Sequence, residues 1–307
     1  MERVQTQESP LIFGRRTTWE EATFSLIAVP WEGSTSFRKG TAYAPEEIRI
    51  VSSQIDYFRS ECPTLESKGI YWSAPASPLP HEGHPEHLYQ AYVLPFVQAQ
   101  VKAALMARKR FGIIGGDHSV PLGAHFVLES FYPEYGVLYI DAHADLRSSY
   151  EGNRYSHATI FYHVSLLPSV SKIVGIGIRD WSSEEMSYAR RQYPRLVLYE
   201  MRRIMQGLYR GRPWVEIVSE VISLLPEKVY VSIDVDGLDV GYVPNTGTPV
   251  PGGLRYEELF FLLEAIPHSG REIIGFDVCE TGGAQLDAIV AAHLIYRLCG
   301  LVLCSEL

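Results

Sequence analysis

Residues 137–145 read VLYIDAHAD, in which an apolar run passes directly into a row of aspartate and histidine side chains. Two other stretches repeat this arrangement, FGIIGGDHS at residues 111–119 and KVYVSIDVD at residues 228–236. Runs that are apolar almost throughout are typical of strands covered on both faces of a parallel sheet. Ligands bind such sheets outside the carboxyl ends of the strands. The polar ends of these three runs are therefore predicted to meet at one site.

The rest of the chain alternates between short apolar runs and helical patterns. Strands are predicted at residues 24–30, 111–115, 137–141, 172–178, 196–199, 228–234 and 273–278. Apolar residues at helical spacing predict helices at residues 45–58, 87–110, 213–225, 256–266 and 285–303. This alternation predicts a three-layer α/β/α fold with a mostly parallel central sheet. Because no repeat or linker interrupts it, residues 1–307 are expected to form a single domain.

Two features lie outside this pattern, a proline-rich stretch and the cysteines. Residues 62–85 contain five prolines and little periodicity, which predicts a long surface loop inside the domain. The four cysteines form no CxxC pair, and three of them lie in apolar runs. They are interpreted as reduced thiols in a reducing compartment. With no secretory signal at the N-terminus, this predicts a cytoplasmic location.

The net charge and the apolar run near the C-terminus argue against nucleic acid and membrane as partners. The formal net charge is −9. A nucleic-acid partner is not expected because a basic footprint is missing, whereas a small cationic substrate is compatible with this charge. Polar residues interrupt the apolar run at residues 288–303. This run is therefore predicted to be a buried terminal helix and not a membrane span.

The polar ends of the three runs have the composition of a binuclear metal site. Side chains two residues apart in an extended chain share a face, so the ligands within each run are expected to point the same way. Four carboxylates close together cannot all stay ionised without cations. Two divalent cations would balance them, with the histidines binding as neutral ligands. The predicted metal ligands are His118, Asp141, His143, Asp145, Asp234 and Asp236.

The ligand types favour manganese, with nickel or cobalt as alternatives. Carboxylate and imidazole without thiolate suit a fairly hard ion, and zinc usually takes fewer ligands. Each run alone also has a structural interpretation, since DxD occurs in caps and turns and GGDHS fits a tight turn into a helix. The three runs together at strand ends favour the metal site.

Over nearly its whole length, the chain resembles the ureohydrolase family of arginases and agmatinases. The motifs that carry the resemblance are VPWEGSTSF (29–37), APEEIR (44–49), GGDHS (115–119), DAHADLR (141–147), EGNRYSHAT (151–159), SIDVDGLD (232–239), TGTP (246–249), PGG (251–253) and DVCE (277–280). The resemblance implies metal-dependent release of urea from a guanidino compound by a homo-oligomer, a trimer or hexamer. It implies one manganese at His118, Asp141, Asp145 and Asp234, and a second at Asp141, His143, Asp234 and Asp236, with Asp141 and Asp234 bridging.

The same resemblance implies catalytic roles for Asp145, His157 and Glu280. Asp145 would orient the attacking hydroxide. His157 would protonate the leaving amine, for which a pKa near neutrality is suited; its structural alternative is a helix cap. Glu280 would bind the substrate guanidinium through paired hydrogen bonds, although a lone glutamate after a strand is by itself unremarkable.

The substrate prediction is agmatine, cleaved to putrescine and urea. GTPVPGG at residues 247–253 and EGNRYSH at residues 151–157 resemble the agmatinase branch. Animal-type arginases carry a second aspartate two residues beyond an Arg-Asp pair, whereas Arg179-Asp180 is followed here by Trp181 and Ser182. The loops after Asp239 and Glu280 depart from the agmatinase pattern, so guanidine, a guanidino acid and arginine remain alternatives.

Two interpretations from other classes are less well supported. A non-catalytic relative on the same scaffold would be expected to lack a metal aspartate or His157, and none is lost. A deacetylase-like metal hydrolase would be expected to carry paired histidines, which are absent from these motifs.

Overall fold

The computed structural model describes residues 11–56, 62–75, 79–80 and 82–304. Within them, eight strands form one sheet in the order β2-β1-β3-β8-β7-β4-β5-β6, and every neighbouring pair is parallel. The strands are β1 (Phe24–Val29), β2 (Ile70–Ser73), β3 (Arg110–Gly115), β4 (Tyr135–Ile140), β5 (Val170–Ile178), β6 (Leu196–Glu200), β7 (Lys228–Asp234) and β8 (Glu272–Cys279).

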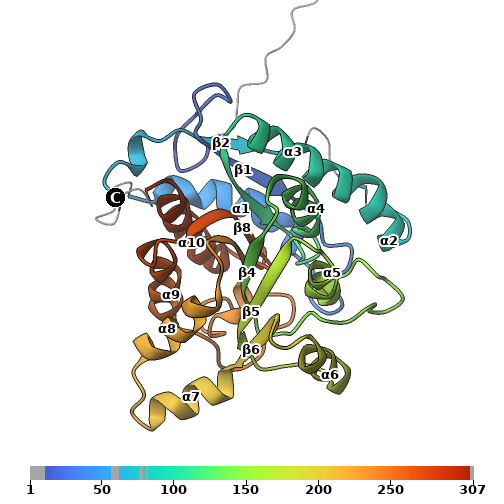
Figure 1. The fold of residues 1–307 in the computed structure, drawn as a ribbon. Coiled ribbons are helices and arrows are strands. Elements are labelled where there is room, and N and C mark those ends of the chain that lie inside the picture. Colours follow the sequence, from blue (N-terminus) through green and yellow to red (C-terminus); the bar gives the residue numbers. More distant parts are fainter. Residues whose placement is uncertain (1–10, 57–61, 76–78, 81, 305–307) are drawn as a thin grey trace, which may run out of the picture.

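Helices cover both faces of the sheet, and each face has its own apolar core (Figure 1). One face carries α1 (Ala44–Val51), α7 (Met201–Tyr209), α8 (Trp214–Leu224), α9 (Tyr256–His268) and α10 (Gln285–Leu303). The other carries the π-helix η4 (Tyr89–Val93), which follows α2 (Pro85–Leu88), then α3 (Leu94–Met106), α4 (Leu122–Phe131), α5 (Ile160–Ser165) and α6 (Ser183–Gln192). The predicted three-layer α/β/α fold is confirmed.

All seven predicted strands are present, with ends that differ by at most two residues. The missed strand is β2, which lies inside the proline-rich stretch and pairs with β1 at the edge of the sheet. The prediction of a loop throughout residues 62–85 is therefore wrong for these four residues. A strand this short between prolines has no periodicity of its own, and its pairing with β1 depends on the tertiary fold.

The predicted helices are present with shifted ends. The helix predicted at residues 87–110 starts at Pro85, passes through the π-helix and ends at Met106. The helix predicted at residues 45–58 ends at Val51 and is followed by a 3-10 turn, and Phe58 lies outside the described residues. Four helices were not predicted: α4, α5, α6 and α7. In α6, a capping box between Ser182 and Glu185 starts a helix whose sequence is mostly polar.

The cysteine interpretation is wrong for one pair. Cys62 and Cys304 form a disulfide with a Cα–Cα distance of 5.8 Å and a sequence separation of 242 residues. Cys279 and Cys299 are buried and free. Only the tertiary fold brings the first pair together, because it places the end of α10 beside residue 62.

The terminal helix α10 packs as a core element. By length and composition it could cross a membrane, with a hydropathy of 1.7, but 67% of its most apolar stretch is buried inside the protein. It packs against α1 and β8. The expectation of a buried terminal helix is confirmed.

Candidate metal centre and substrate pocket

Four adjacent strands at the centre of the sheet end at the site. In the order β3, β8, β7 and β4, their carboxyl ends lead to His118, Glu280, Asp234 and Asp141. Because neighbouring parallel strands end at the same edge, residues far apart in the sequence become neighbours there. The sheet therefore brings all three polar runs together.

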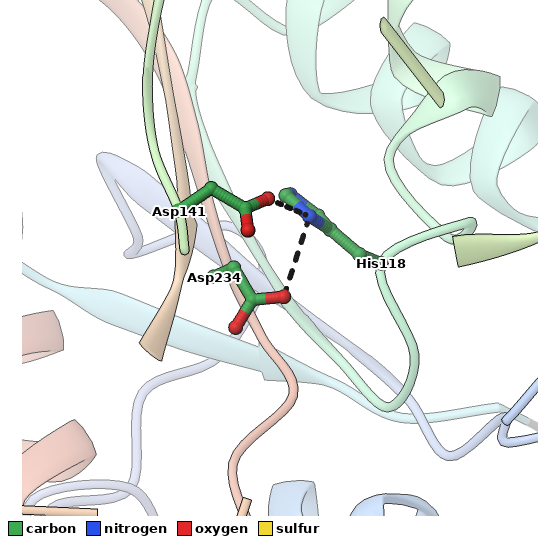
Figure 2. Close-up of side chains that lie close together, drawn as sticks. All are labelled: His118, Asp141 and Asp234. Carbon is green, nitrogen blue, oxygen red and sulfur yellow. Dashed lines mark ion pairs between the residues drawn. The ribbon is translucent and has the colours of Figure 1, made fainter. Parts of the chain in front are cut away.

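His118 is the centre of the first group of ligands. Its Nδ1 lies 3.1 Å from Asp141 Oδ2, 3.2 Å from Asp145 Oδ2 and 3.6 Å from Asp234 Oδ2. Figure 2 shows the imidazole pointing at the carboxylates of Asp141 and Asp234. The side chain of His118 is fully buried. Burial alone would lower the pKa of His118, but the carboxylates of Asp141 and Asp145 beside its Nδ1 outweigh this and raise it.

A second group lies on the other side of Asp141. His143 Nδ1 is 3.5 Å from Asp141 Oδ1 and 3.1 Å from Asp236 Oδ2. Asp141 belongs to both groups, and each group can offer three ligand atoms to one ion. Asp234 belongs to the first group, where its Oδ1 also accepts a hydrogen bond from the Asp236 amide at 2.8 Å. Asp141 is thus shared by the two groups, and the bridging roles of Asp141 and Asp234 both stay predictions.

The ligands converge through bends in the chain and not through a shared strand face. Asp145 has a φ of 50°, in the left-handed region, and Asp236 lies in the 3-10 turn η6 (Val235–Gly237). The alternation rule applies to extended chain, so it does not account for the directions of Asp145 and Asp236 beyond the strand ends. The six side chains nevertheless meet.

The residues present fit two cations. His118 Nδ1, Asp141 Oδ2 and Asp236 Oδ2 are buried and lack a hydrogen-bond partner among the described residues. Unpartnered polar atoms in a protein interior are costly unless a ligand or ion satisfies them. Burial, followed by the charges of Asp236 and Asp141, raises the pKa of Asp234. Burial and the charge of Asp141 raise that of Asp145 to about 8. Without positive charge, this cluster cannot remain fully ionised.

The GGDHS loop fits tightly between neighbouring segments. A Cβ on Gly116 would lie 1.8 Å from the carbonyl oxygen of Trp31, so only glycine fits there. Asp117 accepts a hydrogen bond from the Ser34 amide at 2.9 Å, and Ser34 Oγ accepts one from the His157 amide at 2.9 Å. Asp117 and Ser34 were given no role by the sequence, although both lie inside quoted motifs. They link residues 115–119, the metal loop, to residues 147–157, the loop of His157.

Ser232 and Asp277 support His118 from its other ring nitrogen. Ser232 Oγ lies 3.0 Å from His118 Nε2 and donates to Asp277 Oδ1 at 3.0 Å. Partners of this kind fix the orientation of a ligating histidine. Apart from the position of both residues within motifs, no pattern in the sequence predicts this contact.

Glu280 lies beside the first group of ligands. Its Oε1 accepts a hydrogen bond from the His118 amide at 2.9 Å, and its Oε2 faces Gly247. Glu280 has a φ of 60°, a second left-handed residue at the site. Burial, together with the charge of Asp117, raises the pKa of Glu280.

A pocket of about 520 Å³ opens above the ligands. Of the predicted site residues described, His143, Asp145 and His157 line it. His157 begins the 3-10 turn η5 (His157–Thr159), and its Nδ1 lies 3.2 Å from Ser156 Oγ. Burial lowers the pKa of His157, which favours the neutral imidazole. The remaining predicted ligands and Glu280 are buried.

Charged side chains at the pocket wall differ in how far they are engaged. Arg147 pairs with Glu185 at 3.5 Å, and Arg38 donates to the carbonyl of Pro244 at 2.9 Å. Within the part of the chain that the structure describes, the carboxylate of Asp180 has no hydrogen bond or ion pair. The pocket wall therefore carries an unengaged carboxylate, an arginine paired with a carboxylate, and an arginine that donates to a neutral carbonyl oxygen.

Comparison with known proteins finds similar sequences and a similar fold. A model of the arginase family matches residues 22–300. An N(1)-aminopropylagmatine ureohydrolase of Thermus thermophilus is 33% identical over 296 residues, which cover 95% of this chain and 94% of the relative. An agmatinase of Halalkalibacterium halodurans is 29% identical, covering 88% and 87%. The crystal structure of agmatine ureohydrolase of Thermoplasma volcanium has the same fold, with a TM-score of 0.77, 23% identity and coverage of 97% and 94%.

Proposed function

This chain belongs to the arginase family and is a ureohydrolase, an enzyme that hydrolyses guanidino compounds, and we propose that its substrate is agmatine, cleaved to putrescine and urea. The observation that carries the choice of substrate is the unengaged carboxylate of Asp180 on the pocket wall. Agmatine ends in an ammonium group, which a carboxylate attracts. A guanidino acid ends in a carboxylate, which Asp180 would repel, and Arg147 on the same wall is already paired with Glu185.

The arginase family depends on a binuclear metal centre, and the unpartnered atoms of His118, Asp141 and Asp236 fit that requirement. We propose manganese as the native metal, held by His118, Asp141, Asp145 and Asp234 and by Asp141, His143, Asp234 and Asp236. Two such cations, when bound, act as Lewis acids and lower the pKa of a water.

The protein's own groups would position the substrate and move protons. Glu280 Oε2 faces Gly247 beside the first ligand group, where it can bind the planar guanidinium. Asp145 lines the pocket next to His118 and can accept a proton from the attacking water. His157 lines the same pocket and can shuttle a proton to the departing amine, taking the proton up from solvent and returning to the neutral imidazole. Loss of that amine leaves urea.

A second candidate substrate is N(1)-aminopropylagmatine. The relative of that name at 33% identity favours it, and its additional amine would also suit a pocket wall with a free carboxylate. Both candidates share the guanidinium and a cationic tail, so they require the same chemistry at the metal centre.

The test is a urea-release assay on the purified protein loaded with manganese, with nickel and cobalt in parallel. The substrates are agmatine, N(1)-aminopropylagmatine, arginine, guanidine, guanidinobutyrate and guanidinopropionate. We expect agmatine to give the highest kcat/KM. A higher value for aminopropylagmatine would replace the proposed substrate, and faster hydrolysis of a guanidino acid would contradict the role of the pocket charge. If none of them released urea, the catalytic proposal would be wrong.

The cytoplasmic location and the assembly into trimers or hexamers remain proposals. Light scattering of the purified protein would decide the oligomeric state.

A further inference from the structure

The loop of His157 is held from outside by a short helix that plays no part in the proposed chemistry. Glu86, in α2, accepts three hydrogen bonds from Arg154. Its Oε1 accepts from Arg154 Nε at 3.0 Å and from Nη2 at 2.7 Å, and its Oε2 accepts from the Arg154 amide at 2.9 Å. Although Arg154 is largely exposed, Glu86 is only 8% exposed. One carboxylate therefore fixes both the side chain and the backbone of a residue 68 positions away.

Tyr89 connects the same loop to the metal motif. Its ring stacks on Tyr155 with centroids 5.5 Å apart and an interplanar angle of 16°. Its hydroxyl donates to the carbonyl oxygen of Ser119 at 2.8 Å, one residue beyond His118. Tyr89 is fully buried. It thus touches both loops that supply the site, and neither contact reaches the substrate pocket.

Glu86 in α2 and Tyr89 at the start of η4 lie on the same side of one continuous helical segment. Glu86 and Tyr89 are three residues apart, a spacing that places side chains on one face of a helix. Tyr89 also begins the π-helix η4. π-Helical turns are rare in proteins overall, and those that occur are often found at functional sites.

Short-range hydrogen bonds connect the backbone of Arg154 to the residues on either side of His157. Thr159 Oγ1 donates to the Arg154 carbonyl at 2.8 Å and accepts from the Ser156 amide at 3.0 Å. On the other side, the His157 amide donates to Ser34. A movement of Arg154 would therefore displace the imidazole three residues later.

We propose that Glu86 and Tyr89 are positioning residues that keep the loop of His157 aligned with the metal loop. This inference rests on the proposed function only through the role of His157. A displacement of about 1 Å in a catalytic group can lower a rate by two orders of magnitude. Because His157 acts after the substrate has bound, the effect falls on kcat more than on KM.

The experiment compares Glu86→Gln with Glu134→Gln, an exposed glutamate distant in sequence. Glutamine keeps one acceptor but loses the charge and the second acceptor. We expect kcat for urea release to fall about 10- to 100-fold, with KM changed by less than about threefold. Bound manganese per chain should stay the same, and amide hydrogen exchange across residues 147–158 should become faster. Glu134→Gln should change none of these.

A second pair of variants tests the tyrosine. Tyr89→Phe removes the hydroxyl bond to Ser119 and keeps the ring, whereas Tyr92→Phe changes an exposed tyrosine of the same π-helix. We expect Tyr89→Phe to lower kcat several-fold and to speed exchange in the same segment. Tyr92→Phe should behave as the unmodified protein.

A double-mutant cycle guards against unfolding of a variant. Arg154 is exposed, so Arg154→Gln should fold. The double variant with Glu86→Gln and Arg154→Gln should lower kcat no more than the more damaging of the two single changes. Unchanged exchange in Glu86→Gln and Tyr89→Phe would overturn the proposal. Faster exchange with an unchanged kcat would also overturn it. If the unmodified protein released no urea, the proposed function would fail, while the exchange measurement would still decide whether these residues hold the loop.

Discussion

The proposed metal centre lies at the ends of strands in the middle of the sheet, whereas the rim of the pocket is made mostly of loops. Its proposed ligands follow β3, β4 and β7, are mostly buried, and lie close to one another. The rim comes from residues near 36–38, 147–150, 180–185 and 248–250, which follow four separate elements. The sheet determines the first arrangement, and the local conformation of each loop determines the second. The reaction type should therefore depend on the metal centre and the choice of substrate on the rim.

The largest effect is expected from Asp141→Asn, because Asp141 belongs to both ligand groups. Asparagine keeps the shape of the side chain but removes the charge that holds the cations. We expect urea release to fall by at least about a thousandfold and bound metal per chain to fall with it. Metal analysis together with the urea assay checks this. Full metal content in an inactive variant would separate catalysis from metal binding at this residue and contradict its bridging position.

An intermediate effect is expected from Glu280→Gln. The amide can still accept the hydrogen bond from His118, so metal content should be unchanged. The loss of charge weakens the contact with the guanidinium, and we expect kcat/KM to fall about 100-fold. If metal were lost as well, Glu280 would belong functionally to the metal centre and not to the substrate.

The smallest effect is expected from Asp180→Asn, at the rim. Because the carboxylate lies at an open wall and is screened by solvent, we expect the KM for agmatine to rise about three- to fivefold with kcat unchanged. Guanidine has no tail, so its hydrolysis, where measurable, should not change. An equal loss for both compounds would show that Asp180 supports the metal centre and does not read the tail.

The same contrast explains what the sequence could predict. Apolar runs ending in DAHAD and SIDVD mark buried strands and their ligands, so the fold and the meeting of six side chains followed from local pattern. The bends at Asp145 and Asp236 did not, because a pattern of residue types does not specify φ and ψ. β2 and the contact of Cys62 with Cys304 depend on segments far apart in the chain.

Supporting contacts were harder still to foresee. Asp117, Ser34 and Ser232 lie within the quoted motifs, yet nothing in the sequence says which atom each one contacts. Glu86 lies outside every motif, between the surface loop predicted at residues 62–85 and the helix predicted at residues 87–110. Its role depends on Arg154, which is 68 residues away.

The left-handed backbone at Asp145 and Glu280 sets a limit on improving this protein by selection for heat resistance. Asp145 and Glu280 adopt positive φ values, which carry a conformational cost for most side chains. Glycine avoids this cost, and asparagine is found in this region more often than most residues. A screen that rewards only survival at high temperature would favour Gly or Asn at both positions, and each such gain would remove a carboxylate assigned to the reaction. Robustness and turnover are thus opposed at these two residues, and a thermostabilised variant would have to be selected for both.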